Sequence, residues 1–201
     1  MSIKPIETYY NGHRFRSRLE AKWAVFFDAA GIRYQYEPEG FVLSNGTYYL
    51  PDFYLPDLKL WVEVKGVMDE KSRKKIELFS DELEWEESKL WVLGDIPYPA
   101  DRISDFYNEK NLGTDAFWVF AHNAADGPYL PCICPACGKV GVEFDGRGWR
   151  VDECTEYDTP LVYPQAASLH HDDKGYSYDA PVLMSAYKKA REARFEHGEK
   201  P

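Results

Sequence analysis

The sequence lacks long hydrophobic runs, has few cysteines and carries no excess of positive charge. Its apolar runs are far shorter than the roughly 18 residues that a membrane-spanning helix needs, so no membrane partner is expected. The first residues contain no apolar stretch typical of a signal peptide, which predicts a cytoplasmic protein. The formal net charge is −10, so contact with nucleic acid would have to use local basic patches instead of the overall field.

The chain has enough apolar and aromatic residues to build a core. Of its 201 residues, 44% are hydrophobic and 16% aromatic, which excludes disorder of the chain as a whole. Residues 121–129 are small and polar and carry Gly127 and Pro128, a pattern typical of a linker or long turn. We therefore predict a larger α/β domain over residues 1–121 and a smaller module, with all the cysteines, over residues 122–201.

Helix-like and strand-like segments alternate over the first part of the chain. Apolar residues recur with helical spacing over residues 17–30, where Ser17 is a candidate cap and Gly31 a stop signal. Further helices are predicted over residues 71–80 and 186–197. Runs of aromatic and β-branched residues predict short strands over residues 33–36, 41–43, 48–55, 60–65, 90–93 and 117–120.

Two of the predicted strands bring an aspartate and a glutamate face to face. If residues 48–55 and 60–65 form a tight hairpin, Asp52 lies directly opposite Glu63. Cross-strand Cβ atoms are about 4.5–5.5 Å apart, so the two carboxylates repel each other. Lys65 lies on the same face as Glu63, because side chains alternate along a strand. Two acids and an amine are thus predicted to converge on one patch of an apolar sheet.

A divalent cation would offset this repulsion. Mg²⁺ typically binds one or two carboxylates together with water and phosphate oxygens. Glu20, at the edge of the apolar face of the first helix, could reach the same patch. Lys65 could then position or deprotonate a water, or stabilise charge on a phosphate. The alternative is an ordinary edge hairpin with solvated acids, but the apolar residues on either side of Glu63 favour a central strand.

These residues carry a resemblance to the PD-(D/E)XK nuclease superfamily. Pro51-Asp52, followed after ten residues by Glu63-Val64-Lys65, resembles the signature of that superfamily. Residues 15–24 (FRSRLEAKWA) resemble the first helix of its phage-type, junction-resolving and transposon-end-cleaving members. The resemblance covers about residues 10–95. It implies an α/β fold with a restriction-endonuclease-like αβββαβ core, a small mixed sheet flanked by helices.

The resemblance also implies an activity, which is Mg²⁺-dependent (or Mn²⁺-dependent) hydrolysis of phosphodiester bonds. Carried over by position, the metal ligands are Glu20, Asp52, Glu63 and the Val64 carbonyl, and Lys65 orients the attacking water. We therefore expect a nuclease that acts on DNA, branched DNA included, in a bacterial or phage-infected cell, and a homodimer is left open. The alternatives are a non-catalytic DNA- or protein-binding protein that retains the nuclease fold, and a phage protein that inhibits a host enzyme.

Two basic clusters flank the proposed metal site along the chain. They are candidates for binding DNA phosphates, although runs of charge are also typical of solvated helix faces. Their members are Arg14, Arg16, Arg18, Lys71, Arg73, Lys74 and Lys75.

The cysteines predict a structural zinc site in the C-terminal module. Two cysteines separated by two residues can chelate one Zn²⁺, and a structural site needs four ligands. The alternative is a small domain with reduced, metal-free cysteines. The candidate ligands are Cys134, Cys137 and Cys154, with Cys132 as the simplest fourth ligand and His170 or His171 as substitutes.

Overall fold

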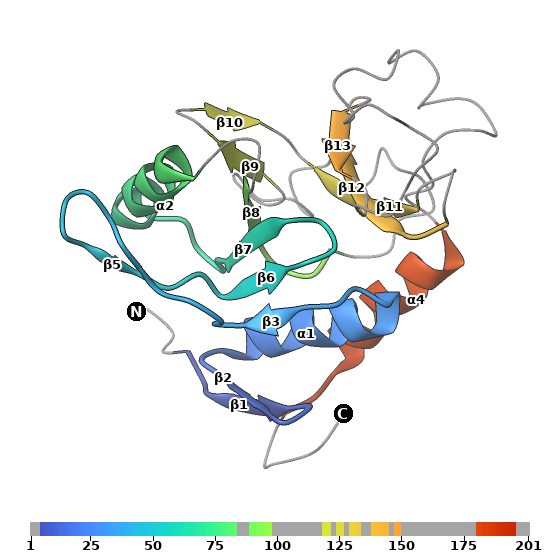
Figure 1. The fold of residues 1–201 in the computed structure, drawn as a ribbon. Coiled ribbons are helices and arrows are strands. Elements are labelled where there is room, and N and C mark those ends of the chain that lie inside the picture. The colour runs from blue at the N-terminus through green and yellow to red at the C-terminus, as the bar shows by residue number, and fades with distance from the viewer. Residues whose placement is uncertain are drawn as a thin grey trace.

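The computed structural model describes residues 5–83, 89–97, 118–121, 124–126, 129–133, 138–144, 147–149 and 180–195. Over these residues the fold is mixed α/β, as predicted, with helices on both sides of a central sheet (Figure 1). None of the helices in this part of the chain is long and apolar enough to cross a membrane.

The first helix, α1 (Arg18–Ala30), begins and ends where the sequence predicted. The Ser17 hydroxyl caps it by accepting the Glu20 amide at 3.2 Å, which satisfies one of the amides left open at a helix start. Gly31 ends it with φ 73°, a left-handed conformation that glycine adopts without a Cβ clash.

Two further helices in the described part of the chain differ from their predicted limits. Helix α2 covers Glu70–Glu82, one residue before and two residues after the prediction, and Asp69 caps it. Helix α4 covers Pro181–Glu192 instead of residues 186–197, so the predicted C-terminal helix was placed too late. The reason is that the ring of Pro181 fixes its φ near the helical value, which suits the first turn of a helix. The buried residues then repeat from Leu183 onward at helical spacing.

Within the described residues, the central sheet has six strands, in the order β10-β9-β8-β7-β6-β3. Strands β7 and β8 are parallel, and the other neighbours are antiparallel. The parallel pair needs a crossover connection, and α2 lies in it. The strands are β3 (Gln35–Tyr36), β6 (Phe53–Leu55), β7 (Leu60–Val64), β8 (Lys89–Leu93), β9 (Trp118–Ala121) and β10 (Ala124–Asp126).

The other strands that the structure describes form three small sheets. The predicted strand 48–55 is in fact two strands in different sheets, because Pro51 has no amide to donate and interrupts the ladder. The predicted linker 121–129 contains β10, which adds to the central sheet despite its small side chains. The small sheets are β1 (Thr8–Tyr10) with β2 (His13–Phe15), β4 (Phe41–Val42) with β5 (Tyr48–Tyr49), and β11 (Leu130–Ile133) with β12 (Val140–Phe144) and β13 (Arg147–Trp149).

Among the described residues, buried side chains form two clusters, one on each face of the central sheet. Along β7, Leu60, Val62 and Val64 join the larger cluster with α1 and α4. Trp61 points the other way and packs with Phe79 of α2. Strand β7 is therefore covered on both faces, as expected for a central strand.

The larger cluster combines residues from both predicted domains. Helix α4 packs on α1, with the rings of Phe26 and Tyr187 4.5 Å apart. Cys132 on β11 is fully buried in the same cluster. The other candidate zinc ligands, Cys134, Cys137, Cys154, His170 and His171, lie outside the described residues, so the zinc module stays a prediction.

Candidate active site

The register between β6 and β7 is the predicted one. Phe53 pairs with Val62 and Leu55 with Leu60. Just before β6, the Asp52 amide donates to the Val62 carbonyl at 3.0 Å. Asp52 and Glu63 thus come from adjacent parts of the hairpin, and both are buried, with 3% and 5% of their surfaces exposed. Two carboxylates at such a position are expected to cost stability, so their presence needs an explanation.

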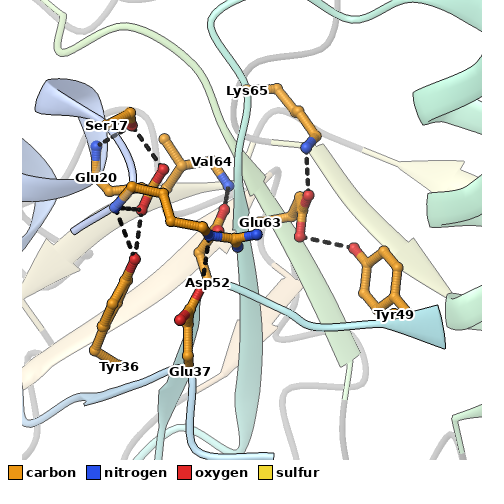
Figure 2. A network of polar contacts seen from close by, with 10 residues as sticks. Ser17, Glu20, Tyr36, Glu37, Tyr49, Asp52, Glu63, Val64 and Lys65 are labelled. Atoms are coloured by element: carbon orange, nitrogen blue, oxygen red, sulfur yellow. Dashed lines mark hydrogen bonds and ion pairs between the residues drawn. The ribbon is translucent and has the colours of Figure 1, made fainter. Parts of the chain in front are cut away.

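Each carboxylate oxygen of Asp52 accepts a hydrogen bond (Figure 2). Its Oδ2 accepts the Val64 amide at 2.7 Å, and its Oδ1 faces the Arg16 guanidinium at 2.6 Å. Burial raises the pKa of Asp52 well above its ordinary range, and the charges of Glu63 and Glu20 raise it further. The Val64 amide and Arg16 oppose this shift without cancelling it. Asp52 therefore lies within electrostatic reach of both Glu63 and Glu20.

Glu63 is held by two partners on the α2 side of the sheet. Its Oε1 lies 2.5 Å from the Lys65 ammonium, and its Oε2 accepts the Tyr49 hydroxyl at 2.9 Å. Burial acts to lower the pKa of Lys65, but Glu63 and Asp52 outweigh it, so that pKa is raised above its ordinary value. Lys65 therefore keeps its positive charge at neutral pH, which makes it a donor and a cation and not a base in this state.

Glu20 lies in the first turn of α1 and points into the same network. Its carboxylate accepts the Ser17 hydroxyl at 2.7 Å, the Tyr36 hydroxyl at 2.8 Å and the Arg16 amide at 3.0 Å. Only 6% of the residue is exposed. A carboxylate near a helix N-terminus is favoured by the positive end of the dipole. This accounts for how a buried glutamate is tolerated beside two other acids.

A fourth carboxylate, which the sequence analysis missed, also belongs to this cluster. The Arg16 guanidinium bridges Asp52 and Glu37, with Nε 2.5 Å from Oε1 of Glu37. The Glu37 amide donates to the Asp52 carbonyl at 2.9 Å, and Glu37 has a φ of 44°, a left-handed conformation that is rare for glutamate. Its pKa is raised by burial first, and Glu20 and Glu63 add to the shift. No spacing in the sequence links Glu37 to the motif.

The carboxylates are neutralised by the protein's own cations in this structure. Among the described residues, no three His, Cys, Asp or Glu side chains are close enough to share one metal ion. Arg16 and Lys65 supply positive charge to Asp52 and Glu63 instead. The donor set nevertheless has the right chemistry for a hard cation, since carboxylate and carbonyl oxygens are what Mg²⁺ binds.

The predicted DNA-binding residues are distributed over several surfaces. Arg14 pairs with Glu7, Arg73 with Glu77 and Lys74 with Glu70. Lys71 is exposed, and Arg18 faces a groove between α1 and α4. Two members of the set adjoin the acids: Arg16, and Lys75, whose ammonium lies 5.1 Å from the centroid of the Tyr49 ring.

Part of the sequence is similar to two phage proteins. Over 65 residues it is 42% identical to Endonuclease I of Escherichia phage T7, a segment that covers 30% of this chain and 42% of that protein. Over 67 residues it is 37% identical to Endodeoxyribonuclease 1 of Enterobacteria phage T3, covering 32% of this chain and 43% of that protein. No family model and no solved structure matches the chain. The similarity therefore spans less than half the length of each of these relatives.

Proposed function

We propose that this chain is a nuclease of the PD-(D/E)XK type that hydrolyses phosphodiester bonds in DNA with Mg²⁺ or Mn²⁺. The observation that carries the proposal is the convergence of buried Asp52 and Glu63 with Lys65 on the β6–β7 hairpin, and of Glu20 on α1. A buried cluster of like charges lowers the stability of the folded protein, and such clusters are typical of catalytic sites.

The order of elements and the relatives support the same proposal. A helix (α1) precedes β6, just before which Asp52 lies, and β7, which carries Glu63; a helix (α2) and a strand (β8) follow them. This order agrees with the αβββαβ core that the sequence resemblance implies. The two phage relatives are named as an endonuclease and an endodeoxyribonuclease, which favours DNA as the substrate. We extend the proposed substrates to branched DNA on the resemblance to junction-resolving enzymes.

The chemistry follows from the four residues. In this structure the three carboxylates are not close enough to share one ion, so they would have to move together on binding. Glu20, Asp52, Glu63 and the Val64 carbonyl would then hold the cation, which when bound supplies a Lewis acid and relieves charge on the phosphate. Lys65, held protonated beside Glu63, would donate to the attacking water or to a phosphoryl oxygen. Tyr49 fixes the second oxygen of Glu63, so the carboxylate and the ammonium are oriented before substrate arrives.

One observation favours a second candidate, a DNA-binding protein without catalysis. The ion pairs of Arg16 with Asp52 and of Lys65 with Glu63 already balance much of the buried charge. A protein that had lost its cation would need such internal partners. The two candidates differ in whether the protein cleaves DNA when a divalent cation is added.

A cleavage panel tests the proposal. Linear, circular, nicked, single-stranded and four-way DNA, and an RNA strand, would be incubated with the protein across a Mg²⁺ titration and in chelator. We expect metal-dependent cleavage that Glu63→Gln abolishes. Glu70→Gln is the matched control, because Glu70 is an exposed acid paired with Lys74 on α2. Absence of cleavage by the wild-type protein on every substrate would leave the binding candidate.

We also propose a structural Zn²⁺ held by the cysteines of the C-terminal module. Its support is the spacing of Cys134 and Cys137 in the sequence. Elemental analysis of purified protein should find one zinc per chain, and a protein without zinc would remove this proposal.

A further inference from the structure

A basic groove runs between the start of α1 and the end of α4. It has a cavity volume of about 420 Å³. The two helices pack antiparallel, since Val182 at the start of α4 lies in a cavity beside Ala30 at the end of α1. Residues far apart in the sequence therefore meet in this groove, and Figure 1 shows α4 against α1. The charged residues that line it are Arg18, Lys22, Arg191, Glu192 and Arg194.

The charge of this lining is opposite to that of the whole chain. Four of the charged residues are cations and one is an acid, whereas the chain carries a net charge of −10. Arg18 stands at the first position of α1, where the helix dipole disfavours a cation. Lys22 lies one turn further along the same face, and like charges at this spacing destabilise a helix by a few tenths of a kcal/mol. An anionic ligand in the groove would offset these unfavourable interactions, and this would favour its binding.

The short segment after α4, which carries Arg194 and Phe195, is held in position at this groove. After α4, Phe195 packs edge-on against Tyr10 of β1, with ring centroids 6.2 Å apart. This contact fixes the segment that carries Arg194, a residue exposed at the rim of the groove. A cation on an anchored backbone loses less entropy on binding than one on a free tail.

The groove lies close to the acid cluster. Arg16, which contacts Asp52, precedes Arg18 by two residues, so their Cα atoms are within about 7 Å of each other. Leu19, the residue after Arg18, lies beside Gly66, the residue that follows Lys65. The start of α1 thus presents Glu20 to the site and Arg18 and Lys22 to the groove. Phosphates follow each other every 3.4 Å or so of helix axis along one DNA strand, so the two places are a few nucleotides apart.

We propose that the α1–α4 groove binds the phosphate backbone of DNA a few nucleotides from the phosphodiester held at the acid cluster. This inference rests on the proposed function for the identity of its ligand. It assigns a role to the C-terminal helix, which carries none of the nuclease motif. The groove therefore contributes to affinity and to the path of the strand, and takes no part in the chemistry.

Two double variants test the groove. Lys22→Gln with Arg194→Gln removes two cations from the lining, and Lys188→Gln with Lys189→Gln removes two exposed cations of α4 outside it. Both leave the same net charge, so the overall field changes equally. Binding to a short fluorescent DNA duplex would be measured by anisotropy in chelator, to prevent cleavage, across a salt series. Thermal melting would check that both variants are folded.

We expect the groove pair to weaken binding about tenfold at moderate salt and to reduce the slope of log affinity against log salt by about one to two. The control pair should change affinity by less than about twofold. Equal losses from both pairs, or wild-type binding by the groove pair, would overturn the groove. If the wild-type protein cleaves no DNA but the groove pair selectively weakens binding, the proposed nuclease function is wrong and the proposed DNA binding by the groove is supported.

Discussion

The two halves of the acid cluster are neutralised in different ways. Glu63 is paired with Lys65, two residues along the chain, and with Tyr49, which is buried. Asp52 is paired with Arg16, whose side chain is 53% exposed and lies on the segment before α1. The Glu63 half is therefore built from the hairpin and its neighbour, while the Asp52 half depends on a side chain that solvent reaches.

This difference separates a fixed charge from an exchangeable one. Lys65 cannot move far from Glu63, because both stand at the end of β7 and only 30% of the Lys65 side chain is exposed. Arg16 is also paired with Glu37, so its charge keeps one partner if it leaves Asp52. We infer that Lys65 acts in the reaction. Arg16 instead balances the charge of Asp52 until a cation or a phosphate binds there.

The largest expected effect compares the two cations in catalysis. Lys65→Gln should lower the single-turnover rate of DNA cleavage by about a hundred- to a thousandfold, the range for loss of one preorganised donor. Arg16→Gln should lower it by about fivefold, because a half-exposed charge contributes about 1 kcal/mol. Rates would be measured at saturating Mg²⁺, and equal losses in the two variants would break the comparison.

The sequence was sufficient for the hairpin half of this site. The alternation of side chains and a tight turn predicted the register that pairs Phe53 with Val62, and helical spacing predicted the buried face of α1 beside which Glu20 lies. These are local rules, and β6, β7 and α1 obey them. The position of Glu37 depends on the pairing of β3 with β6 and on a left-handed backbone, which no local pattern specifies.

Two other features were outside the reach of local rules. Arg16 was assigned to a basic patch because its neighbours are basic, but tertiary packing gives it Asp52 and Glu37 as partners. The docking of α4 on α1 joins residues more than a hundred positions apart. Periodicity can predict that each helix has an apolar face, but it does not say which faces meet.

A second contrast concerns the two tyrosines that donate to the acids. Tyr49 is the donor to Oε2 of Glu63, whereas Oε2 of Glu20 has the Arg16 amide besides Tyr36. Tyr49→Phe should therefore lower the free energy of unfolding by about 1.5–3 kcal/mol, as for a lost bond to a buried charge. Tyr36→Phe should cost about 0.5–1 kcal/mol. Urea denaturation measures both.

The reverse order of these two losses would mean that the Glu20 side is the more tightly held part of the cluster. A Tyr48→Phe variant is the control, because Tyr48 neighbours Tyr49 on β5 but is 79% exposed. It should leave the free energy of unfolding within about 0.5 kcal/mol of the wild type.

The pH dependence of stability tests the Asp52 half. The pKa of Asp52 is raised above the ordinary value of 3.8. At a pH between these two values, Asp52 is protonated in the folded protein and ionised in the unfolded chain. The contribution of Asp52 to the free energy of unfolding therefore falls as pH rises from about 4 toward the folded pKa. Asp52→Asn should remove this fall and stabilise the protein by about 1–2 kcal/mol at neutral pH.

Urea denaturation of both proteins near pH 4 and pH 8 gives the difference between them. The stabilising effect of Asp52→Asn should shrink toward the acid end, where the wild-type carboxyl is protonated in both states. An effect that grows toward the acid end would mean that Arg16 and the Val64 amide outweigh the burial of Asp52.

The smallest expected effect is on cation binding, and it addresses the exchangeable charge directly. If Arg16 must leave Asp52 before a cation binds there, Arg16→Gln removes a competitor that contributes about 1 kcal/mol, and Mn²⁺ should bind about fivefold more tightly. Calorimetric titration of the DNA-free protein measures this affinity. Arg14→Gln is the matched control, because Arg14 pairs with Glu7 away from the acids, and it should leave Mn²⁺ affinity unchanged. Weaker Mn²⁺ binding by Arg16→Gln would show that the guanidinium helps to assemble the carboxylates, which would make both halves fixed.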